Sequence, residues 1–516
     1  MIASCRHLLL AGVLLLIAIG EAWAGPPRLE RERCAFRPPR GDKVQCYALI
    51  VPENRSAPKS NEVRLKVAVL KAKRPLAPDP LVYLAGGPGD APLVASTAGA
   101  DPLAEGDWWN DTATIRRRRD VIILSQRGAG GSTPSLDCFE PRTSEPARAR
   151  RRAVTEPQER EILLRCRADF DRRKIELAMY STPALADDVA DLVAAMQLFR
   201  VNLYGISYGT RWALEVMRRH PGIVRSAVLD GLYPPQINGE QNEPEIVQGA
   251  FEQLYAECAG DKVCRERNPD LANDVKVVLS EAERAPLELV LALDDGPQPV
   301  KLDGAKLLLV LLHMMRQGEA ALVPEAVTAL KRGDKWLVRQ FAEDLEEDDG
   351  GLLETNAQQF GGLFNTIECR ETWAGVDQEA RERAIRSGGV YSLSAQLSKL
   401  PAFCPVWRVP VAPPAERQPV TASIPVLLIS GGYDWLTPSS WGREAAKHLP
   451  EARHVIFRAA GHGVSSQDPC AARLRDEFID APDPRGPLPC RADTPLDFAG
   501  AVERIRGMAR DGERKP

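Results

Sequence analysis

Residues 201–221, VNLYGISYGTRWALEVMRRHP, change from a short apolar run to a helical pattern within a few positions. The run VNLYG is typical of a buried strand, and TRWALEVMRRH is typical of a helix that ends before Pro221. Ser207 lies on the turn between them, with Gly205 and Gly209 on either side. A turn this tight requires small neighbours, and it lifts the serine hydroxyl above the sheet, where the helix N-terminus favours developing negative charge. Ser207 is therefore a candidate nucleophile, and the alternative is an ordinary turn without chemistry.

A serine hydroxyl is a poor nucleophile at neutral pH, and it needs a base, normally histidine. The chain has 6 histidines. Five stand in a leader, at a helix end, on an apolar helix or at the start of a strand, places that suit other roles: His7, His220, His313, His448 and His454. His462 remains, in AAGHGV just past the last predicted strand, where ligands bind in open parallel sheets. We expect His462 to be the general base.

The carboxylate that holds the histidine should also follow a strand. Asp434 lies in ISGGYDWLTP, in a glycine-bearing loop after a predicted strand, and Asp230 ends the predicted strand AVLDG. We prefer Asp434 because its loop is longer, whereas Asp230 also suits a turn in which it binds backbone amides. The catalytic set is then Ser207, Asp434 and His462 in chain order.

A tetrahedral intermediate needs two N–H groups aimed at its oxyanion. One is expected from Tyr208, directly after the candidate nucleophile. The other is expected from the loop AGGPG, residues 85–89, which follows the predicted strand in DPLVYL. Glycines let that backbone approach a substrate carbonyl, and we prefer Gly87, with Gly86 next to it. The alternative for this loop is an ordinary turn.

The first residues, 1–24, predict export. They have a basic start, an apolar centre and the small-x-small ending Ala22-Trp23-Ala24, the pattern of a secretory signal peptide cleaved after Ala24. An uncleaved anchor is the alternative, but the apolar centre is short for a membrane span. We expect a secreted or periplasmic protein with no stable membrane association after cleavage.

The cysteine count agrees with export. Of 11 cysteines one lies in the leader, and an even number in an oxidising compartment indicates disulfides. The other ten fall into neighbouring pairs: Cys34 and Cys46, Cys138 and Cys166, Cys258 and Cys264, Cys369 and Cys404, Cys470 and Cys490. A metal site at Cys258 and Cys264 is disfavoured because no second ligand cluster accompanies them. We expect no metal and no cofactor.

The alternation of predicted strands and helices divides the chain into segments. Strands alternate with helices up to about residue 234, and the alternation resumes near residue 416 with SIPVLLISGG. Between them the sequence is mostly helical. With 516 residues the chain is too long for one compact core, so we expect a parallel-sheet domain, 25–234 and 416–516, interrupted by a helical cap at 235–415. A net charge of −4 gives no reason to expect a nucleic-acid partner.

With these residues assembled, the chain resembles the proline iminopeptidase and tripeptidyl aminopeptidase family of α/β-hydrolases, and more closely the tripeptidyl branch. The matching motifs lie in the same order along the chain: GGPG at 86–89, SQRGAGGS at 125–132, GISYGT at 205–210, LDG at 229–231, GGYDWLTP at 431–438 and GHG at 461–463. Two positions depart from the family pattern. Ala85 stands where the family usually has histidine, and Ser125 stands where it usually has aspartate. Both changes bear on loop support and specificity.

The resemblance implies an α/β-hydrolase fold, with a mostly parallel sheet, helices on both faces and a helical cap inserted before the last two strands. It also implies an aminopeptidase that releases tripeptides or small N-terminal units from short peptides, and we expect it to act as a monomer. Such an enzyme must hold a free α-ammonium group. Glu368 and Glu371, in NTIECRETW beside Cys369, are candidates for this role; the alternative is that both are solvated helix charges.

Other functions remain open at this stage. A carboxylesterase or lipase would use the same three catalytic residues on esters, and a binding protein could keep only the fold. Epoxide hydrolases and dehalogenases are disfavoured because they need a carboxylate at the position of Ser207.

Overall fold

The structure is a computed structural model that describes residues 26–57, 59–94, 108–138, 156–293, 296–348, 352 and 361–512. The predicted signal peptide, residues 1–24, lies outside the described residues. No helix in these ranges has the length and apolar character needed to cross a bilayer.

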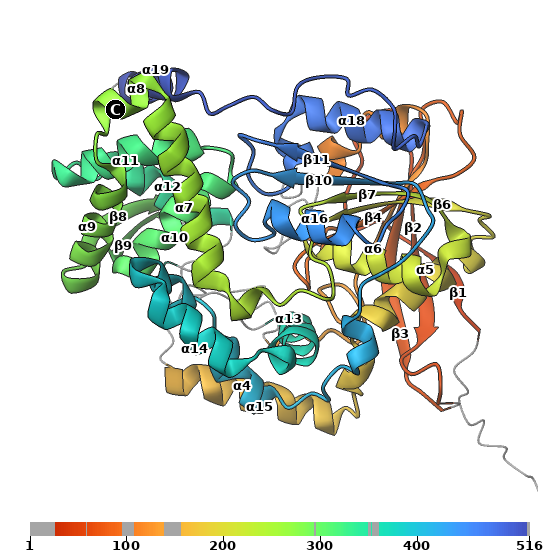
Figure 1. Cartoon of the computed structure of the whole chain (residues 1–516). Helices are drawn as coiled ribbons and strands as arrows, with labels where there is room; N and C mark the ends of the chain where they lie inside the picture. The colour runs from red at the N-terminus through yellow and green to blue at the C-terminus, as the bar shows by residue number, and fades with distance from the viewer. Residues whose placement is uncertain are drawn as a thin grey trace, which may run out of the picture.

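The centre of the molecule is a large sheet (Figure 1). Within the described ranges its nine strands have the order β1-β2-β3-β5-β4-β6-β7-β10-β11. Three strands at one edge are antiparallel: β1 (Arg28–Glu32), β2 (Val44–Pro52) and β3 (Glu62–Leu70). The remaining six are parallel: β4 (Leu81–Leu84), β5 (Val121–Leu124), β6 (Val201–Ile206), β7 (Val224–Asp230), β10 (Val426–Gly431) and β11 (Ala452–Phe457).

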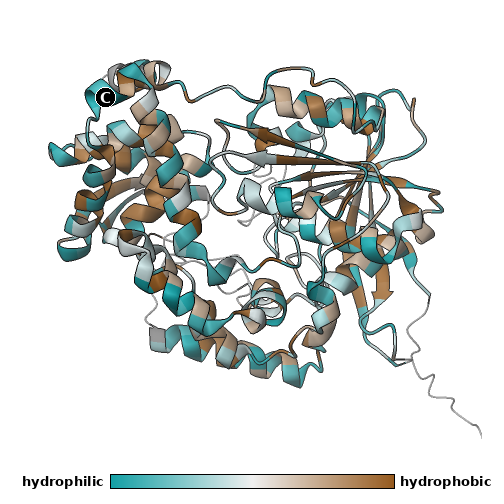
Figure 2. Ribbon diagram, in the orientation of Figure 1, coloured by the Kyte–Doolittle hydropathy of each residue, from teal (hydrophilic) through white to brown (hydrophobic). Residues whose placement is uncertain are grey.

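The burial of the strands explains their sequences. β5 (VIIL) and β10 (VLLISG) are buried along their whole length, as strands covered on both faces must be. Successive residues of β10 enter opposite cores: Val426 and Leu428 join one hydrophobic cluster, and Leu427 and Ile429 join another. Figure 2 shows these apolar strands between helices that turn their polar sides outward.

Helices cover both faces of the sheet. One face carries α5 (Thr182–Ala195), α6 (Tyr208–Arg219) and α16 (Ser439–Ala446), and the other carries α2 (Trp108–Asp111) and α18 (Pro469–Asp480). The short helix α17 (Val464–Gln467) lies just before α18. This is the arrangement predicted for the sheet domain.

The chain between β7 and β10 forms the cap. Its helices, within the described residues, are α7 (Glu243–Gly260), α8 (Lys262–Arg267), α9 (Leu271–Arg284), α10 (Gly304–Arg316), α11 (Val323–Lys331), α12 (Trp336–Asp348), α13 (Gly362–Ile367), α14 (Gln378–Ser387) and α15 (Leu400–Trp407). The cap also holds an antiparallel hairpin of β8 (Leu287–Leu293) and β9 (Gly296–Leu302). The sequence of this region predicts mostly helix, and the hairpin was not predicted. The alternation of buried leucines with exposed residues along β8 explains why it forms a strand.

Two segments outside 235–415 lie against the cap. The last helix, α19 (Phe498–Gly512), lies beside α8 in Figure 1 and also contacts the short turn Ala320–Leu322 of the cap. Leu496, Phe498 and Ala501 belong to the cap's own hydrophobic cluster, and Arg504 forms an ion pair with Glu319 at 2.8 Å. The chain after the sheet therefore returns to the cap, so residues 416–516 do not all pack on the sheet as expected. At the opposite end, α4 (Glu156–Arg172) packs against α15.

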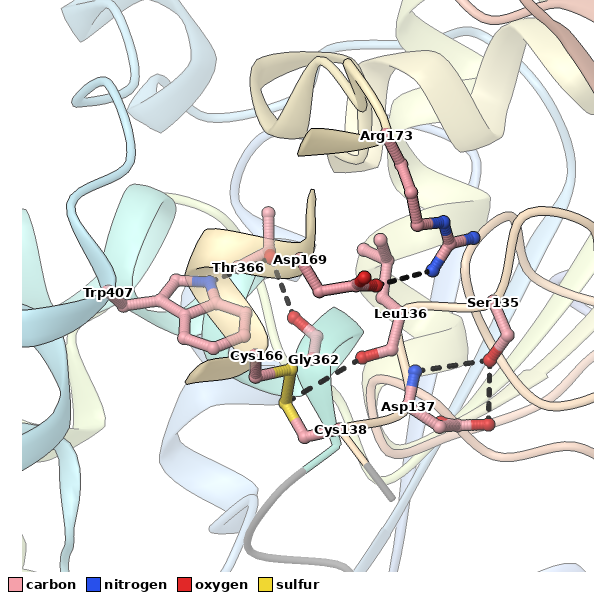
Figure 3. Close-up of a disulfide and its surroundings, with 10 residues drawn as sticks. All are labelled: Ser135, Leu136, Asp137, Cys138, Cys166, Asp169, Arg173, Gly362, Thr366 and Trp407. Atoms are coloured by element: carbon pink, nitrogen blue, oxygen red, sulfur yellow. Dashed lines mark hydrogen bonds and ion pairs between the residues drawn. A yellow bond between two sulfur atoms is a disulfide. The ribbon is translucent and has the colours of Figure 1, made fainter. Parts of the chain in front are cut away.

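Ten cysteines form five disulfides, which are the neighbouring pairs expected from the sequence: Cys34–Cys46, Cys138–Cys166, Cys258–Cys264, Cys369–Cys404 and Cys470–Cys490. Figure 3 shows Cys138–Cys166, which joins a loop of the sheet domain to α4 close to the start of α13. A Cβ at Gly362 would lie 1.9 Å from the carbonyl oxygen of Leu136. Only glycine allows this close contact, which fixes α13 against the sheet domain.

Candidate active site

Ser207 lies on the turn between β6 and α6, with φ 57° and ψ −126°. A positive φ is unfavourable for a residue with a Cβ, so the fold holds this serine in a strained conformation. Both flanking glycines are required. A Cβ added to Gly205 would lie 2.4 Å from the main-chain oxygen of Gly209. A Cβ added to Gly209 would lie 2.0 Å from the main-chain oxygen of Leu84. The Ser207 N–H donates to the main-chain oxygen of Asp230 at 2.9 Å, which ties the turn to the end of β7.

His462 lies beside Asp434. The distance from His462 Nδ1 to Asp434 Oδ2 is 2.8 Å, and Thr437 supports the carboxylate with its N–H at 2.9 Å and its hydroxyl at 2.6 Å. Burial lowers the pKa of the His462 imidazole, but the nearby Asp434 carboxylate outweighs it, and the pKa lies above the ordinary histidine value. The pair has the geometry of a base held by an acid, with Nε2 left for another partner.

Asp230, the rival acid, has a different set of partners. Its carboxylate accepts hydrogen bonds from the N–H of Val464 at 3.0 Å, the N–H of Ser465 at 2.7 Å and the Ser465 hydroxyl at 2.5 Å. These groups begin α17, directly after the loop that carries His462. Asp230 therefore binds backbone amides and fixes this loop.

Gly231 lies between the turn that carries Ser207 and the imidazole of His462. It follows Asp230, whose oxygen accepts the Ser207 N–H, and an added Cβ there would lie 3.1 Å from His462 Cε1. Its φ of 67° is a conformation that glycine adopts without strain. The imidazole thus lies against the end of β7, the strand next to the one that ends at Ser207.

The glycine loop at 85–89 borders the serine. A Cβ at Gly86 would lie 3.3 Å from Ser207 Cβ, while Gly87 has a φ of 98° and makes the turn. Gln126, buried in the QRG motif, donates to Ala85 O at 3.1 Å and to Gly86 O at 2.7 Å, and it accepts from the N–H of Gly89 at 2.9 Å. The sequence analysis recognised the motif but gave Gln126 no role.

Tyr208 is the first residue of α6, so its N–H has no partner within the helix. Its phenol hydroxyl lies 2.8 Å from Thr182 Oγ1 at the start of α5. The ring is completely buried, which fixes the first turn of α6 behind the serine.

Glu368 and Glu371, the two acids predicted to bind an amine, lie on a buried π-helical turn, Glu368–Thr372, after α13. Glu371 accepts from the Thr182 N–H at 2.8 Å and from the Thr182 hydroxyl at 2.6 Å. Because each oxygen of Glu371 has a partner at the start of α5, this residue joins the cap to the sheet domain.

Glu368 is held by hydroxyl groups, and Thr372 of the same turn donates to it. Its carboxylate accepts a bond from the Tyr233 hydroxyl at 3.2 Å. Burial raises the pKa of Glu368 to about 7, although the Arg211 guanidinium opposes this shift.

The segment after β7 adds acceptors that the sequence analysis missed. Burial raises the pKa of Glu240, and burial together with the charge of Glu240 raises the pKa of Glu243. Three buried oxygens in this segment have no hydrogen-bond donor among the described residues: Gln236 Oε1, Asn238 Oδ1 and Glu243 Oε2. Buried acceptors are normally satisfied, so each of these oxygens could accept a hydrogen bond from a further donor. The acidic string GEQNEPE directly after the strand was the signal available in the sequence.

In the described residues, no group of three or more His, Cys, Asp and Glu side chains has an arrangement that could hold a metal ion.

Comparison with known proteins adds two family matches. A family model described as the alpha/beta hydrolase fold matches residues 79–272, and one described as TAP-like protein matches residues 390–487. The first match contains the nucleophile turn and the second contains the loops of Asp434 and His462.

Whole-chain relatives extend this likeness. The tripeptidyl aminopeptidase of Streptomyces lividans is 25% identical over 491 residues, which cover 90% of this chain and 86% of the relative. The serine protease Hip1 of Mycobacterium bovis is 24% identical over 441 residues, 78% of each chain. Among solved structures, the proline iminopeptidase of Mycobacterium smegmatis is 16% identical, with 84% of this chain and 97% of the other covered and a TM-score of 0.36.

Proposed function

We propose that this chain, an α/β-hydrolase with a TAP-like C-terminal region, is an exported serine aminopeptidase that hydrolyses short peptides from their free N-termini. Two observations carry the proposal: Ser207 lies on a strained turn, and the half-buried His462 has its Nδ1 2.8 Å from the Asp434 carboxylate. The relatives named above favour peptides over other acyl substrates.

In the proposed reaction the Ser207 hydroxyl attacks the scissile carbonyl while His462 takes its proton. Asp434 holds the imidazole in the required tautomer and stabilises the imidazolium. The N–H groups of Tyr208 and Gly87 bind the developing oxyanion. His462 then returns the proton to the leaving amine, and water cleaves the acyl-enzyme by the same steps in reverse.

The free α-ammonium of the substrate binds in the cap, and Glu368 is the group proposed to receive it. Glu368 is buried with a raised pKa, so an incoming cation both ionises it and pairs with it. Glu371 contributes by fixing the π-helical turn through its bonds to Thr182. The similarity to a tripeptidyl aminopeptidase supports the length of the released unit, and we propose that it is a tripeptide or a similarly small N-terminal unit.

We further propose that the protein acts as a secreted or periplasmic monomer. Five disulfides support an oxidising compartment, because such bonds persist there and are rare in the cytosol.

The test compares wild type with Ser207→Ala on tripeptide anilides carrying a free or an acetylated N-terminus, and on a fatty-acyl ester. Wild type should cleave the free-amine anilide fastest, and Ser207→Ala should lose turnover while keeping its melting temperature. Equal rates on acetylated peptides, or faster cleavage of the ester, would instead favour the carboxylesterase alternative. Near-normal turnover by Ser207→Ala would end the assignment of the nucleophile.

A further inference from the structure

The loops that carry His462 and Asp434 are both hydrogen-bonded to the C-terminal end of one cap helix, α10. The main-chain N–H of His462 donates to Arg316 O at 2.9 Å. The indole N–H of Trp435, the neighbour of Asp434, donates to Leu312 O at 3.0 Å. The base loop and the acid loop thus rest on the same helix, although α10 lies more than a hundred residues before either of them in the chain.

The end of α10 has a specific acceptor for the sheet domain. The last four carbonyls of a helix lack partners inside it. Those of His313, Met314 and Met315 accept from the next residues of the chain, Gln317, Glu319 and Gly318. Arg316 O instead accepts from His462 and from the side chain of Gln467. The last carbonyl of the cap helix α10, that of Arg316, is therefore hydrogen-bonded to the loop that carries His462.

Gln467 connects the two partners directly. Its Nε2 donates to Arg316 O at 3.1 Å and to His462 O at 2.7 Å. One carboxamide thus holds both the carbonyl of the proposed base and the carbonyl of the cap helix. Gln467 lies at the end of α17, whose start is fixed by the Asp230 carboxylate.

The loop that carries His462 lies so close to the end of α10 that position 461 must be glycine. An added Cβ at Gly461 would lie 2.0 Å from Arg316 O and 2.4 Å from Met315 O. Backbone atoms are in the way at both distances, so only glycine permits the loop to seat on α10. A loop packed this tightly against a helix end has little freedom to shift on its own.

We propose that Gln467 and Trp435 are positioning residues, which hold the base loop and the acid loop in register on the C-terminus of α10, so that the cap helps to assemble the catalytic pair as well as to bind substrate. This inference rests on the proposed function, because it concerns the same serine, histidine and aspartate. Catalytic rates are sensitive to such positioning, since a displacement of about 1 Å can cost roughly 10²-fold.

The test uses Gln467→Met, which keeps the side-chain length but removes the donor, and Trp435→Phe, which removes the indole N–H. The matched control is Gln248→Met, because Gln248 is half-buried and its side-chain amide donates to Glu252, one turn further along the same helix α7. Active sites are counted with a fluorophosphonate, so that rates refer to competent enzyme. We expect kcat to fall roughly tenfold to a hundredfold in each test variant, with KM within about twofold of wild type and no change in the control.

Two further measurements separate positioning from general damage. The His462 Nδ1 proton, bonded to Asp434, should give a far-downfield NMR signal in wild type and in the control. It should be absent in His462→Ala and shifted or broadened in Gln467→Met. Gln467→Lys restores a donor to the two carbonyls, and it should recover most of the lost rate.

The outcomes are distinct from those of the proposed function. If His462→Ala abolishes turnover while Gln467→Met and Trp435→Phe keep the wild-type kcat and NMR signal, the positioning inference is wrong and the triad stands. If His462→Ala remains active on anilides and on p-nitrophenyl acetate, the proposed function itself fails. A loss of rate fully explained by fewer labelled active sites would reduce Gln467 to a folding role and also overturn the inference.

Discussion

Asp434 and Asp230 lie at the ends of neighbouring strands and differ in what they bind. Asp434 holds His462 Nδ1, whereas Asp230 accepts from the first N–H groups of α17. Chain position alone left the two as rivals, because each follows a strand. Ser207 and His462 remain proposed catalytic residues, and the sequence singles them out because each belongs to a short motif with a glycine on either side. The roles of Gln126, Gln467 and Glu371 were not predictable, because each depends on a carbonyl or helix start that is distant in the chain.

The two aspartates should therefore respond differently to the same substitution. Asp434→Asn should lower kcat by about 10⁴-fold, as loss of the acid does in other triads. Asp230→Asn should mainly lower stability, by about 1–3 kcal/mol, because it weakens the buried acceptors of α17. Steady-state kinetics with thermal melts of both variants check this. A larger loss of kcat in Asp230→Asn than in Asp434→Asn would mean that the acid was placed on the wrong strand.

The pH profile of kcat/KM should rise with a midpoint above the ordinary histidine pKa of about 6.5. The rate rises with pH because a histidine can act as a base only in its neutral form. Asp434 raises the pKa of His462, so the imidazolium persists to higher pH and the active form appears later. In Asp434→Asn the residual activity should have a lower midpoint, since the raising charge is gone. An unchanged midpoint would show that another group titrates.

N-acetylation of a good peptide substrate should lower kcat/KM severely, because it removes the ammonium that pairs with Glu368 and leaves a buried carboxyl without its partner. Glu368→Gln should narrow the preference for free-amine over acetylated peptides. Glu371→Gln should chiefly lower the melting temperature, since Glu371 binds Thr182 at the start of α5. The ratio of the two kcat/KM values measures this. If Glu371→Gln narrows the preference and Glu368→Gln does not, the two roles are exchanged.

At the scale of elements, the predicted α/β-hydrolase fold is confirmed. It could be predicted because strands buried on both faces leave apolar runs in the sequence, such as VIIL and VLLISG. The β8–β9 hairpin was missed because Pro297 and Pro299 weaken the strand pattern of its second half. The docking of α19 was missed for another reason. An amphipathic helix reveals which of its faces is apolar, but the sequence does not say which partner covers that face.

The disulfide Cys369–Cys404 should matter for substrate affinity as well as for stability. It joins the π-helical turn that carries Glu368 to α15. Replacing both cysteines by serine should destabilise the fold by about 2–4 kcal/mol and raise KM for free-amine peptides. The matched control is the serine pair at Cys258 and Cys264, which closes a loop of only 6 residues between α7 and α8. That variant should lose less stability and keep its KM; a raised KM in the control alone would contradict the argument.

At the scale of the whole molecule, the main chain passes between the sheet domain and the cap at three places in the described residues. The chain enters the cap after β7, leaves it before β10, and returns to it at Leu496. Leu496 and Phe498 are buried in the cap cluster, and each contributes roughly 1.5–3 kcal/mol by its burial. The third connection restrains the cap against the sheet.

A chain that ends at residue 495 should therefore melt at a lower temperature and have a looser cap. Its rate on long peptides should rise relative to its rate on short ones, because the entrance is less restrained. Competition between two peptides of different length, analysed by mass spectrometry, measures this ratio. Residues 506–516 provide the matched control, since their removal leaves Leu496, Phe498 and Ala501 in the cap cluster. An unchanged length preference in the 495 variant would mean that α19 stabilises the cap without setting its entrance.

Because the chain returns to the cap near its C-terminal end, the hydrophobic cluster of the cap can be completed only late in synthesis. Leu496, Phe498 and Ala501 follow both catalytic loops in the sequence, so they leave the ribosome after every other part of the site. Until they arrive, the cap core has an open face where three apolar side chains belong. The hydrophobic cluster of the cap is thus among the last interior surfaces to close, and a growing chain carries both proposed catalytic loops before that cluster is complete.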